Sequence, residues 1–398
     1  MAKKQTPKVL IFEDLDDQYA LLQSKLESAG YRPVRARSAQ EFNAHVPWKQ
    51  YVLIIMDLFL GEGPDREPLG IELTRSVRKK NKHIPIIVAS TWEPDRHDVA
   101  EGFRAGANDY VDKLELIHDT HGILQRHLAA AEASSLRAAE AEFPLPIAFL
   151  LRDYRRSKSN PRQRLERLIE LFEVTLKLVA YSLICASRDE IRKLKPELRE
   201  AFARPSLGHL SRLIDALPGT DTPLHSIAER AHRQRFREIT GTLINVRNDY
   251  SHGGARAEAV YEKQLELHES EVMEFLDMLQ EFREMRVVCP SRPKLLSGSV
   301  TYEYPMQVFA GSNPDPESDE FRTNLVLHEK VYLLDAVGEH AVPLDPFCQY
   351  LVCDDCLDKK LFLYRLARHG ELWMIDHVYG HTIQTQSGWQ AYQDLFEA

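Results

Sequence analysis

The chain of 398 residues has few cysteines and lacks a long hydrophobic run. Its five cysteines are odd in number and scattered, which argues against a disulfide scaffold and for a reducing compartment. No apolar stretch approaches the length of a membrane-spanning helix, and the polar first residues do not resemble a signal peptide. We therefore expect a soluble, cytoplasmic protein that has no membrane partner.

The chain also lacks an overall excess of basic residues. Its net charge is −9 and its pI is about 6.0, which excludes a uniformly basic nucleic-acid coat protein. The charge is uneven, because residues 151–250 have 20 Lys and Arg against 13 Asp and Glu, whereas residues 251–398 have 12 against 25. The basic segment favours an anionic partner, and the acidic segment makes DNA binding by the C-terminal part unlikely. The length suggests about two to four domains.

Residues 1–130 alternate short apolar runs with amphipathic segments. The runs at 9–12, 52–56 and 84–89 are continuously apolar, and a last short strand is expected at 109–111. Helical spacing and glycine stops predict helices between them, over 17–29, 69–79 and 98–105. Continuous apolar strands separated by helices are typical of a doubly wound parallel α/β sheet that is buried on both faces.

Polar side chains follow these strands at their carboxyl ends. Glu13 and Asp14 follow the first run, Asp57 follows the second, Ser90 the third and Lys113 the last. Because the carboxyl ends of parallel strands share one edge, we expect these five residues to lie together. Neighbouring carboxylates suit a hard cation such as Mg²⁺, and a hydroxyl and an ammonium beside them suit phosphoryl transfer.

With the motif Ala105-Gly106-Ala107-x-x-Tyr110-x-x-Lys113, these residues make 8–130 resemble a response-regulator receiver domain. The resemblance implies a five-stranded parallel sheet and an Asp57 that accepts a phosphoryl group from a histidine kinase or a phosphotransfer protein. It further implies that Asp57 binds Mg²⁺ directly.

The same resemblance implies roles for the remaining residues of this edge. Asp14 would also bind Mg²⁺ directly, and Glu13 would act mainly through water. Ser90 and Lys113 would contact the phosphoryl group, and Tyr110 would change rotamer as part of the switch. The alternative is a receiver-like fold that no longer accepts phosphate.

Two departures from the family pattern affect the surroundings of Asp57. Leu114 stands where the family usually has proline, so a different local backbone is expected after Lys113. The loop after Asp57 is long, since Gly70 comes thirteen residues later, and its acids Glu62, Asp65 and Glu67 could shield the site.

Residues 134–285 have helical periodicity throughout, which predicts an all-α bundle within a second domain over 131–285. A helix through 115–140 would connect the receiver to this bundle. We expect phosphorylation of Asp57 to act through that helix by changing the geometry of a homodimer.

The bundle contains the run Arg247-Asn248-Asp249-Tyr250-Ser251-His252 near a helix end. Arginine can hold a phosphate and histidine can transfer a proton near neutral pH, so Arg247, Asn248 and His252 form a candidate catalytic set. Residues 144–285 resemble a HEPN domain with its Arg-x4-His motif, which implies metal-independent cleavage of RNA. A non-catalytic dimerisation or partner-docking module remains the alternative, in which Arg247 and His252 only satisfy local bonds. The pair Glu173 and Lys177 is interpreted as an i,i+4 salt bridge.

Residues 290–398 predict a small β-rich or α+β accessory domain for protein interaction or sensing. Cys353 and Cys356 form one CxxC pair, a spacing found in zinc sites, but a second pair is missing. Buried structural thiols are the main alternative, and a redox pair is a weaker one. Further candidate ligands are Cys348, His369, His377 and His381.

Overall fold

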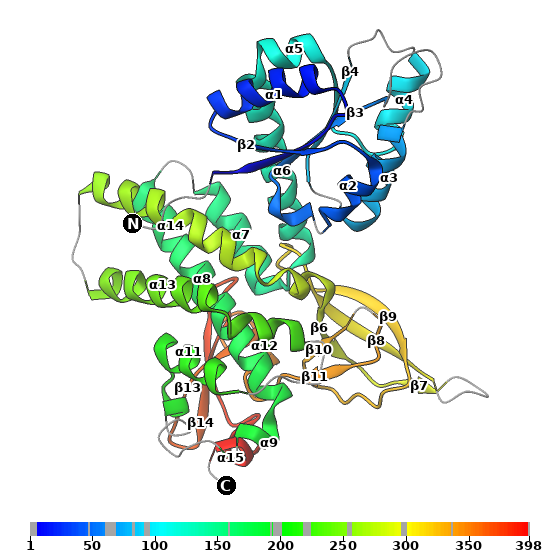
Figure 1. Ribbon diagram of the computed structural model, residues 1–398. Helices are drawn as coiled ribbons and strands as arrows, with labels where there is room; N and C mark the ends of the chain where they lie inside the picture. Colours follow the sequence, from blue (N-terminus) through cyan, green and yellow to red (C-terminus); the bar gives the residue numbers. More distant parts are fainter. Residues whose placement is uncertain are drawn as a thin grey trace. The chain divides into compact units, whose positions relative to one another are not determined.

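The computed structural model divides the chain into two compact units, Met1–Ala138 and Ala139–Ala398 (Figure 1). Each unit is described by itself. The structure describes residues 6–46, 48–59, 69–81, 84–90, 96–157, 160–191, 193, 201–217, 224–252, 257–295, 301–335 and 337–396.

The first unit contains a five-stranded parallel sheet with strand order β2-β1-β3-β4-β5, which confirms the predicted receiver-type fold. The strands are β1 (Lys8–Phe12), β2 (Arg32–Ala36), β3 (Leu53–Asp57), β4 (Ile86–Ser90) and β5 (Asp109–Asp112). The helices are α1 (Asp16–Ser28), α2 (Ala39–Ala44), α3 (Leu69–Lys80), α4 (Arg96–Arg104) and α5 (Lys113–His118), with a 3-10 turn η1 (Trp48–Gln50).

Both faces of this sheet are covered, because side chains of each strand alternate between two cores. One core joins Val9, Ile11 and their neighbours on the sheet to Leu22 and Leu26 of α1. The other joins Leu10 and Phe12 and the residues beside them to side chains of α2 and α3. All five residues of β3 and of β4 are buried, which explains their continuously apolar sequence.

The helical region predicted for 134–285 is confirmed as helical. Its long elements are α6 (Thr120–Glu142), α7 (Leu145–Arg156), α8 (Pro161–Ala186), α11 (Leu207–Ala216), α13 (Gln234–His252) and α14 (Glu258–Asp277). Shorter ones are α9 (Arg188–Ile191), η2 (Ala201–Ala203), α12 (His225–Ala231) and η3 (Gln280–Glu284). Helix α8 packs against α7, α11 and α14, and its C-terminal half is almost fully buried.

The expected single helix through 115–140 is instead interrupted. Helix α5 ends at His118, the next residue Asp119 has a non-helical φ of −122° and ψ of 45°, and α6 starts at Thr120. Asp119 then accepts a hydrogen bond from the amide of Gly122, so its side chain caps the second helix.

Two antiparallel sheets follow the helices. The first has the order β11-β10-β6-β8-β7, with β9 paired to β8; the second is the meander β12-β13-β14-β15. Their strands are β6 (Arg286–Pro290), β7 (Lys294–Leu295), β8 (Tyr302–Phe309), β9 (Glu317–Thr323), β10 (Tyr332–Leu334), β11 (Ala341–Pro343), β12 (Cys348–Val352), β13 (Lys359–Arg368), β14 (Glu371–Ile375) and β15 (Thr382–Thr385), and α15 (Trp389–Phe396) ends the described chain.

An aromatic cluster joins the helices of the second unit to its C-terminal part. Tyr181 of α8 stacks on Phe347 with ring centroids 4.7 Å apart, and its hydroxyl donates to the carbonyl of Tyr364 at 3.0 Å. Phe202 stacks on Phe396 of α15 at 4.4 Å. Residues 139–398 thus form one compact unit, and the predicted division into domains at 131–285 and 290–398 stays a prediction.

Among the helices that the structure describes, none combines the length and the apolar character that crossing a bilayer requires.

Candidate functional site

The structure gathers the predicted acids at the carboxyl edge of the parallel sheet. Glu13 and Asp14 follow β1, and Asp57 is the last residue of β3. One carboxylate oxygen from each lies within 4.8 Å of the other two. The parallel pairing of β1 and β3 produces this arrangement. Phe12 lies opposite Met56, so the two strands end at the same level of the sheet.

Lys113 connects two of these acids. Its Nζ lies 2.6 Å from Oε2 of Glu13 and 2.7 Å from Oδ2 of Asp57. Lys113 and Glu13 are almost completely buried, with exposures of 2% and 1%. A buried ammonium is tolerated only where carboxylates compensate its charge, so the three side chains form one electrostatic unit.

Burial dominates the ionisation of Asp57. Burial, together with the neighbouring carboxylate of Glu13, raises the pKa of this carboxyl to about 6 against the opposing attraction of Lys113. A raised pKa in a site with a specific cationic partner is common at functional positions.

Ser90 and Tyr110 lie on neighbouring strands at this edge. Ser90 ends β4, is 3% exposed, and is in register with Asp112 of β5. Tyr110 is partly buried and packs against the core under α2 and α3. Their predicted phosphoryl-binding and switch roles stay predictions.

The leucine after Lys113 has a structural explanation. Helix α5 begins at Lys113 itself, and the side chain of Asp112 caps it by accepting hydrogen bonds from the amides of Leu114 and Glu115. Proline at 114 has no N–H to donate, so it would remove the shorter of these two capping hydrogen bonds.

Gly70 explains how the chain returns after the long loop that follows Asp57. Its amide donates to the carbonyl of Leu58 at 3.2 Å, and its Cα lies directly against the backbone of Asp57. The acids Glu62, Asp65 and Glu67 fall outside the described residues.

Two residues that the sequence analysis did not select support this site. Arg35 of β2 donates from Nε to the carbonyl of Glu13 and from Nη2 to the carbonyl of Asp14, both at 2.8 Å. Gln18 of α1 accepts a hydrogen bond from Lys113 through Oε1. Arg35 thereby fixes the backbone of the acidic loop, although its only sequence signal was a charge on a partly exposed edge strand.

The acidic cluster fits Mg²⁺. It offers three carboxylates and no sulfur or imidazole donor, which is the oxygen-only chemistry that a hard cation prefers. Asp14 is partly exposed, so water can reach the cluster and complete the coordination shell of the ion.

The second predicted set lies on α13. Nε of Arg247 is 3.2 Å from Oε2 of Glu173 on α8, and the other oxygen of Glu173 is 2.7 Å from Nζ of Lys177. The predicted i,i+4 bridge is therefore present, and Arg247 extends it across two helices. Nη1 of Arg247 also lies 3.5 Å from Oδ1 of Asn248. His252 is the last residue of α13, and its side chain is outside the described set.

Several arginines of the basic segment pair with glutamates from outside it. Arg164 pairs with Glu269 at 2.7 Å, and Arg235 pairs with Glu274. Arg230 and Glu281 make a further pair of this kind, as do Arg155 and Glu140. Part of the positive charge of residues 151–250 is thus compensated by ion pairs inside the second unit.

Comparisons with known proteins concern the first unit. The family description "Response regulator receiver domain" matches residues 9–122. The transcriptional regulatory protein RprY of Bacteroides fragilis is 32% identical over 124 residues, 30% of this chain and 50% of that protein. The transcriptional regulatory protein BaeR of Escherichia coli is 32% identical over 146 residues, 36% of this chain and 57% of that protein. The chain spans about half the length of these curated relatives.

Solved structures of receiver proteins are also similar to this part. A CheY-like receiver domain protein from Methanospirillum hungatei is 22% identical, with 33% of this chain and 99% of that chain covered and a TM-score of 0.29. A receiver protein from Pseudoalteromonas atlantica is 23% identical, with 31% and 99% covered and a TM-score of 0.29. The family match, together with the five-stranded parallel sheet, identifies residues 9–122 as a response-regulator receiver domain of two-component signalling.

Proposed function

We propose that the protein is a phosphorelay response regulator whose Asp57 accepts a phosphoryl group. The observation that carries this proposal is the buried contact of Lys113 with both Glu13 and Asp57, because it keeps a cation where phosphoryl charge develops. The donor is a phosphohistidine of a histidine kinase or of a phosphotransfer protein.

In the transfer, a carboxylate oxygen of Asp57 attacks phosphorus, and the bond from phosphorus to the histidine nitrogen breaks. The nitrogen keeps the electron pair, and Asp57 becomes an acyl phosphate. Glu13, Asp14 and Asp57 are the residues that would hold Mg²⁺, which neutralises phosphoryl charge when bound. Lys113 then pairs with the phosphoryl oxygens, and Ser90 donates its hydroxyl to them.

The test is phosphorylation of the full chain by acetyl phosphate and Mg²⁺, followed by intact-protein mass spectrometry. We expect one added phosphoryl group that hydroxylamine removes. Asp57→Asn should abolish it, whereas Asp17→Asn, an exposed acid on α1, should not change it. Failure of the unsubstituted chain to acquire the group from either acetyl phosphate or a histidine-phosphorylated donor would refute the proposal.

For the output of the second unit, we infer a HEPN-type ribonuclease controlled by Asp57, which works as a homodimer and cleaves RNA. The 2′-hydroxyl of RNA would attack the neighbouring phosphorus and expel the 5′-oxygen, with His252 assisting the proton transfer. Arg247 would stabilise the charged transition state, and Asn248 would position the guanidinium of Arg247. The partly exposed guanidinium of Arg247 beside Asn248 supports this role.

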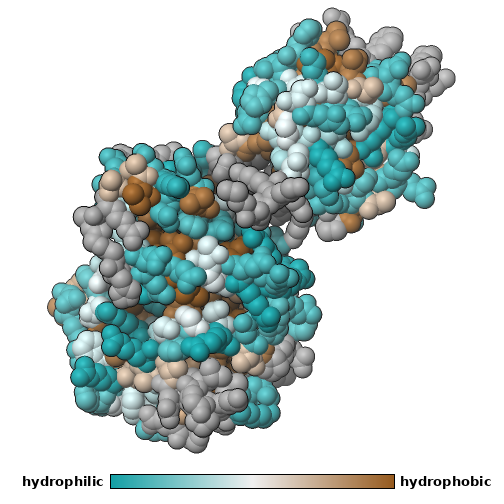
Figure 2. Space-filling view, turned by 60° about the vertical axis from the view of Figure 1, so that its left-hand side comes forward, coloured by the Kyte–Doolittle hydropathy of each residue, from teal (hydrophilic) through white to brown (hydrophobic). Residues whose placement is uncertain are grey.

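The alternative output is a non-catalytic dimerisation or docking module. The engagement of Arg247 by Glu173 favours it, since a carboxylate already contacts Nε of the guanidinium that would hold phosphate. Figure 2 shows apolar residues in the middle of the visible face of this unit with hydrophilic residues around them, a distribution that a docking surface requires.

The two outputs separate in an RNA cleavage assay with and without a phosphoryl mimic at Asp57. Cleavage that Arg247→Ala and His252→Ala abolish supports the ribonuclease. Arg237→Ala, an exposed arginine of the same helix that pairs with Asp215, is the matched control. Equal residual cleavage in all variants, in either state, assigns the second unit to docking.

A further inference from the structure

Two loops of the C-terminal meander lie at the same end of the sheet. One joins β12 to β13 over residues 353–358, and the other joins β14 to β15 over residues 376–381. In an antiparallel meander, alternate connections fall on the same side, so this strand order places the two loops together.

The loops have the same backbone geometry. In the first, the amide of Cys353 donates to the carbonyl of Asp358, and the amide of Leu357 donates to the carbonyl of Cys353. In the second, the amide of Asp376 donates to the carbonyl of His381, and the amide of Gly380 donates to the carbonyl of Asp376.

The residue before the end of each loop is left-handed: φ is 62° at Leu357 and 76° at Gly380. Leucine rarely adopts this conformation. The chain therefore accepts strain directly after Cys356, and the tight turn places the second cysteine of the CxxC pair beside the first.

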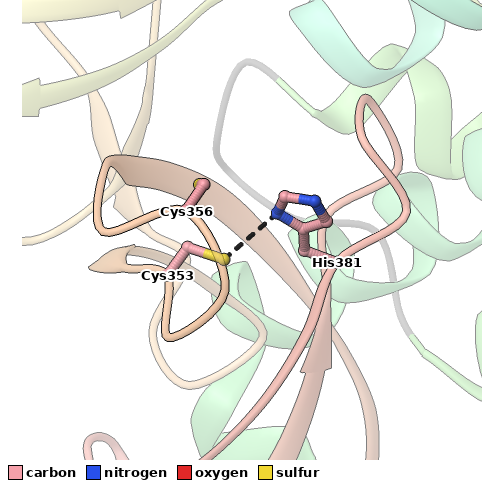
Figure 3. Close-up of side chains that lie close together, drawn as sticks. All are labelled: Cys353, Cys356 and His381. Carbon is pink, nitrogen blue, oxygen red and sulfur yellow. Dashed lines mark hydrogen bonds between the residues drawn. The ribbon is translucent and has the colours of Figure 1, made fainter.

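Cys353, Cys356 and His381 converge between these loops (Figure 3). Their ligand atoms all lie within 4.8 Å of one another, and Sγ of Cys353 is 3.2 Å from Nδ1 of His381. Tetrahedral zinc with ordinary Zn–S and Zn–N bonds places such a sulfur and nitrogen about 3.5 Å apart. Shifts of a few tenths of an ångström would therefore convert the present contact into a ligand pair.

The other candidate ligands are occupied elsewhere. His377 lies 3.5 Å from Glu170 of α8, and the carboxylate of Asp376 accepts hydrogen bonds from the loop amides of Val378 and Tyr379. Cys348 is buried in β12, where burial raises the pKa of its thiol, and His369 contacts Arg368 at the opposite turn of the meander.

We propose that Cys353, Cys356 and His381 bind one Zn²⁺ ion, with water in the fourth position. Two thiolates balance the two positive charges of the ion, and a neutral imidazole adds none, so the complete site around the fully buried Cys353 carries no net charge. Cys356 and His381 are partly exposed, which gives water access to the remaining position. Of the described residues, no fourth His, Cys, Asp or Glu joins this group.

The test uses the full chain, reduced and metal-free, titrated with Co²⁺ and then Zn²⁺ in excess Mg²⁺. Magnesium occupies the oxygen-only cluster of the receiver, and a thiolate-to-cobalt charge-transfer band reports sulfur ligation specifically. We expect a band that saturates at about one ion per chain and that Zn²⁺ removes.

Cys356→Ser and His381→Ala should each weaken binding by at least about 100-fold. Cys289→Ser, a partly buried cysteine of β6, and His369→Ala should bind as the unsubstituted chain does. Both ligand variants change partly exposed residues, and far-UV circular dichroism checks that they remain folded.

Absence of the band in the unsubstituted chain would overturn the proposal, as would its retention in both ligand variants. A Cys353–Cys356 disulfide in protein purified without reductant but with zinc present would also overturn it, in favour of a redox pair.

Discussion

Gly70 lies against the carbonyl of Asp57 so closely that a Cβ at position 70 would be 2.1 Å from that oxygen. The obstacle is backbone rather than a flexible side chain, and it belongs to the candidate phosphoacceptor itself. The contact explains why a glycine is needed where the long loop returns to the sheet.

We therefore expect Gly70→Ala to displace the end of β3. Overpacking of this kind costs about 1–3 kcal/mol of unfolding free energy, and the displaced carboxylate should also lower the rate of phosphorylation by acetyl phosphate. Urea unfolding and the mass assay measure the two effects. Gly102→Ala is the matched control, because a Cβ there would meet only Tyr110 at 3.9 Å. Equal unfolding free energies and phosphorylation rates in the two variants would contradict this explanation.

The ionisation of Asp57 predicts a pH dependence of phosphorylation. Because burial raises its pKa to about 6, the nucleophilic carboxylate and the Mg²⁺ site are complete above that pH. Below it, protons compete, and the initial rate at fixed subsaturating Mg²⁺ should fall by up to about tenfold per pH unit. A rate that stays flat down to pH 5, after correction for donor hydrolysis, would show that the carboxyl is not perturbed.

The same shift affects stability with a definite sign. Between pH 3.8 and about 6 the folded protein holds a proton that the unfolded chain has lost, so the contribution of Asp57 to stability decreases as pH rises through this range. The difference in unfolding free energy between the unsubstituted chain and Asp57→Asn, measured without Mg²⁺, isolates it. From pH 4 to pH 6, the unsubstituted chain should lose unfolding free energy relative to Asp57→Asn.

Arg35 should act on the site without touching the phosphoryl group. Arg35→Ala removes both hydrogen bonds to the acidic loop, and we expect Mg²⁺ binding to weaken by about 10-fold or more, as for other groups that position metal ligands. Arg32→Ala, exposed on the same strand, should leave the affinity unchanged. Isothermal titration with Mg²⁺ compares the two variants. Unchanged affinity in Arg35→Ala would show that Arg35 does not position the metal ligands.

Glu173→Gln should destabilise the second unit, because one carboxylate serves both Lys177 and Arg247. Loss of these charged contacts should cost about 1–3 kcal/mol. Burial acts to raise the pKa of Glu173, but the two cations outweigh it and the net shift is downward. The stabilisation is therefore full above about pH 4.5 and is lost as the pH falls through the lowered pKa. Glu238→Gln, exposed on α13, is the control in thermal unfolding at pH 7 and pH 3.5.

The residues of the receiver site could be predicted because topology does most of the positioning. Once apolar runs and helices alternate, the carboxyl ends of the strands must meet, and this brings Glu13, Asp57 and Lys113 together whatever the intervening loops contain. Arg35 escaped prediction because it lies on an edge strand, where a charged residue is ordinarily solvated. The helix break at Asp119 depends on a side-chain cap that periodicity does not reveal.

The C-terminal residues show the opposite case. Four further ligand candidates surrounded the CxxC pair in sequence, and spacing could not choose among them. The choice depends on which hairpin loops share an end of the sheet, and this follows from strand pairing over long sequence distances.

Ion pairs of the second unit connect the basic segment 151–250 with the acidic segment 251–398. Arg164, Arg230 and Arg235 each pair with a glutamate from the acidic segment 251–398, so part of the charge of each segment is neutralised in three dimensions. An approaching polyanion meets a field of mixed sign, and its capture depends on short-range contacts rather than on long-range attraction. On the proposed ribonuclease function, binding of RNA should consequently respond only weakly to ionic strength, unlike binding by a protein with an open basic face.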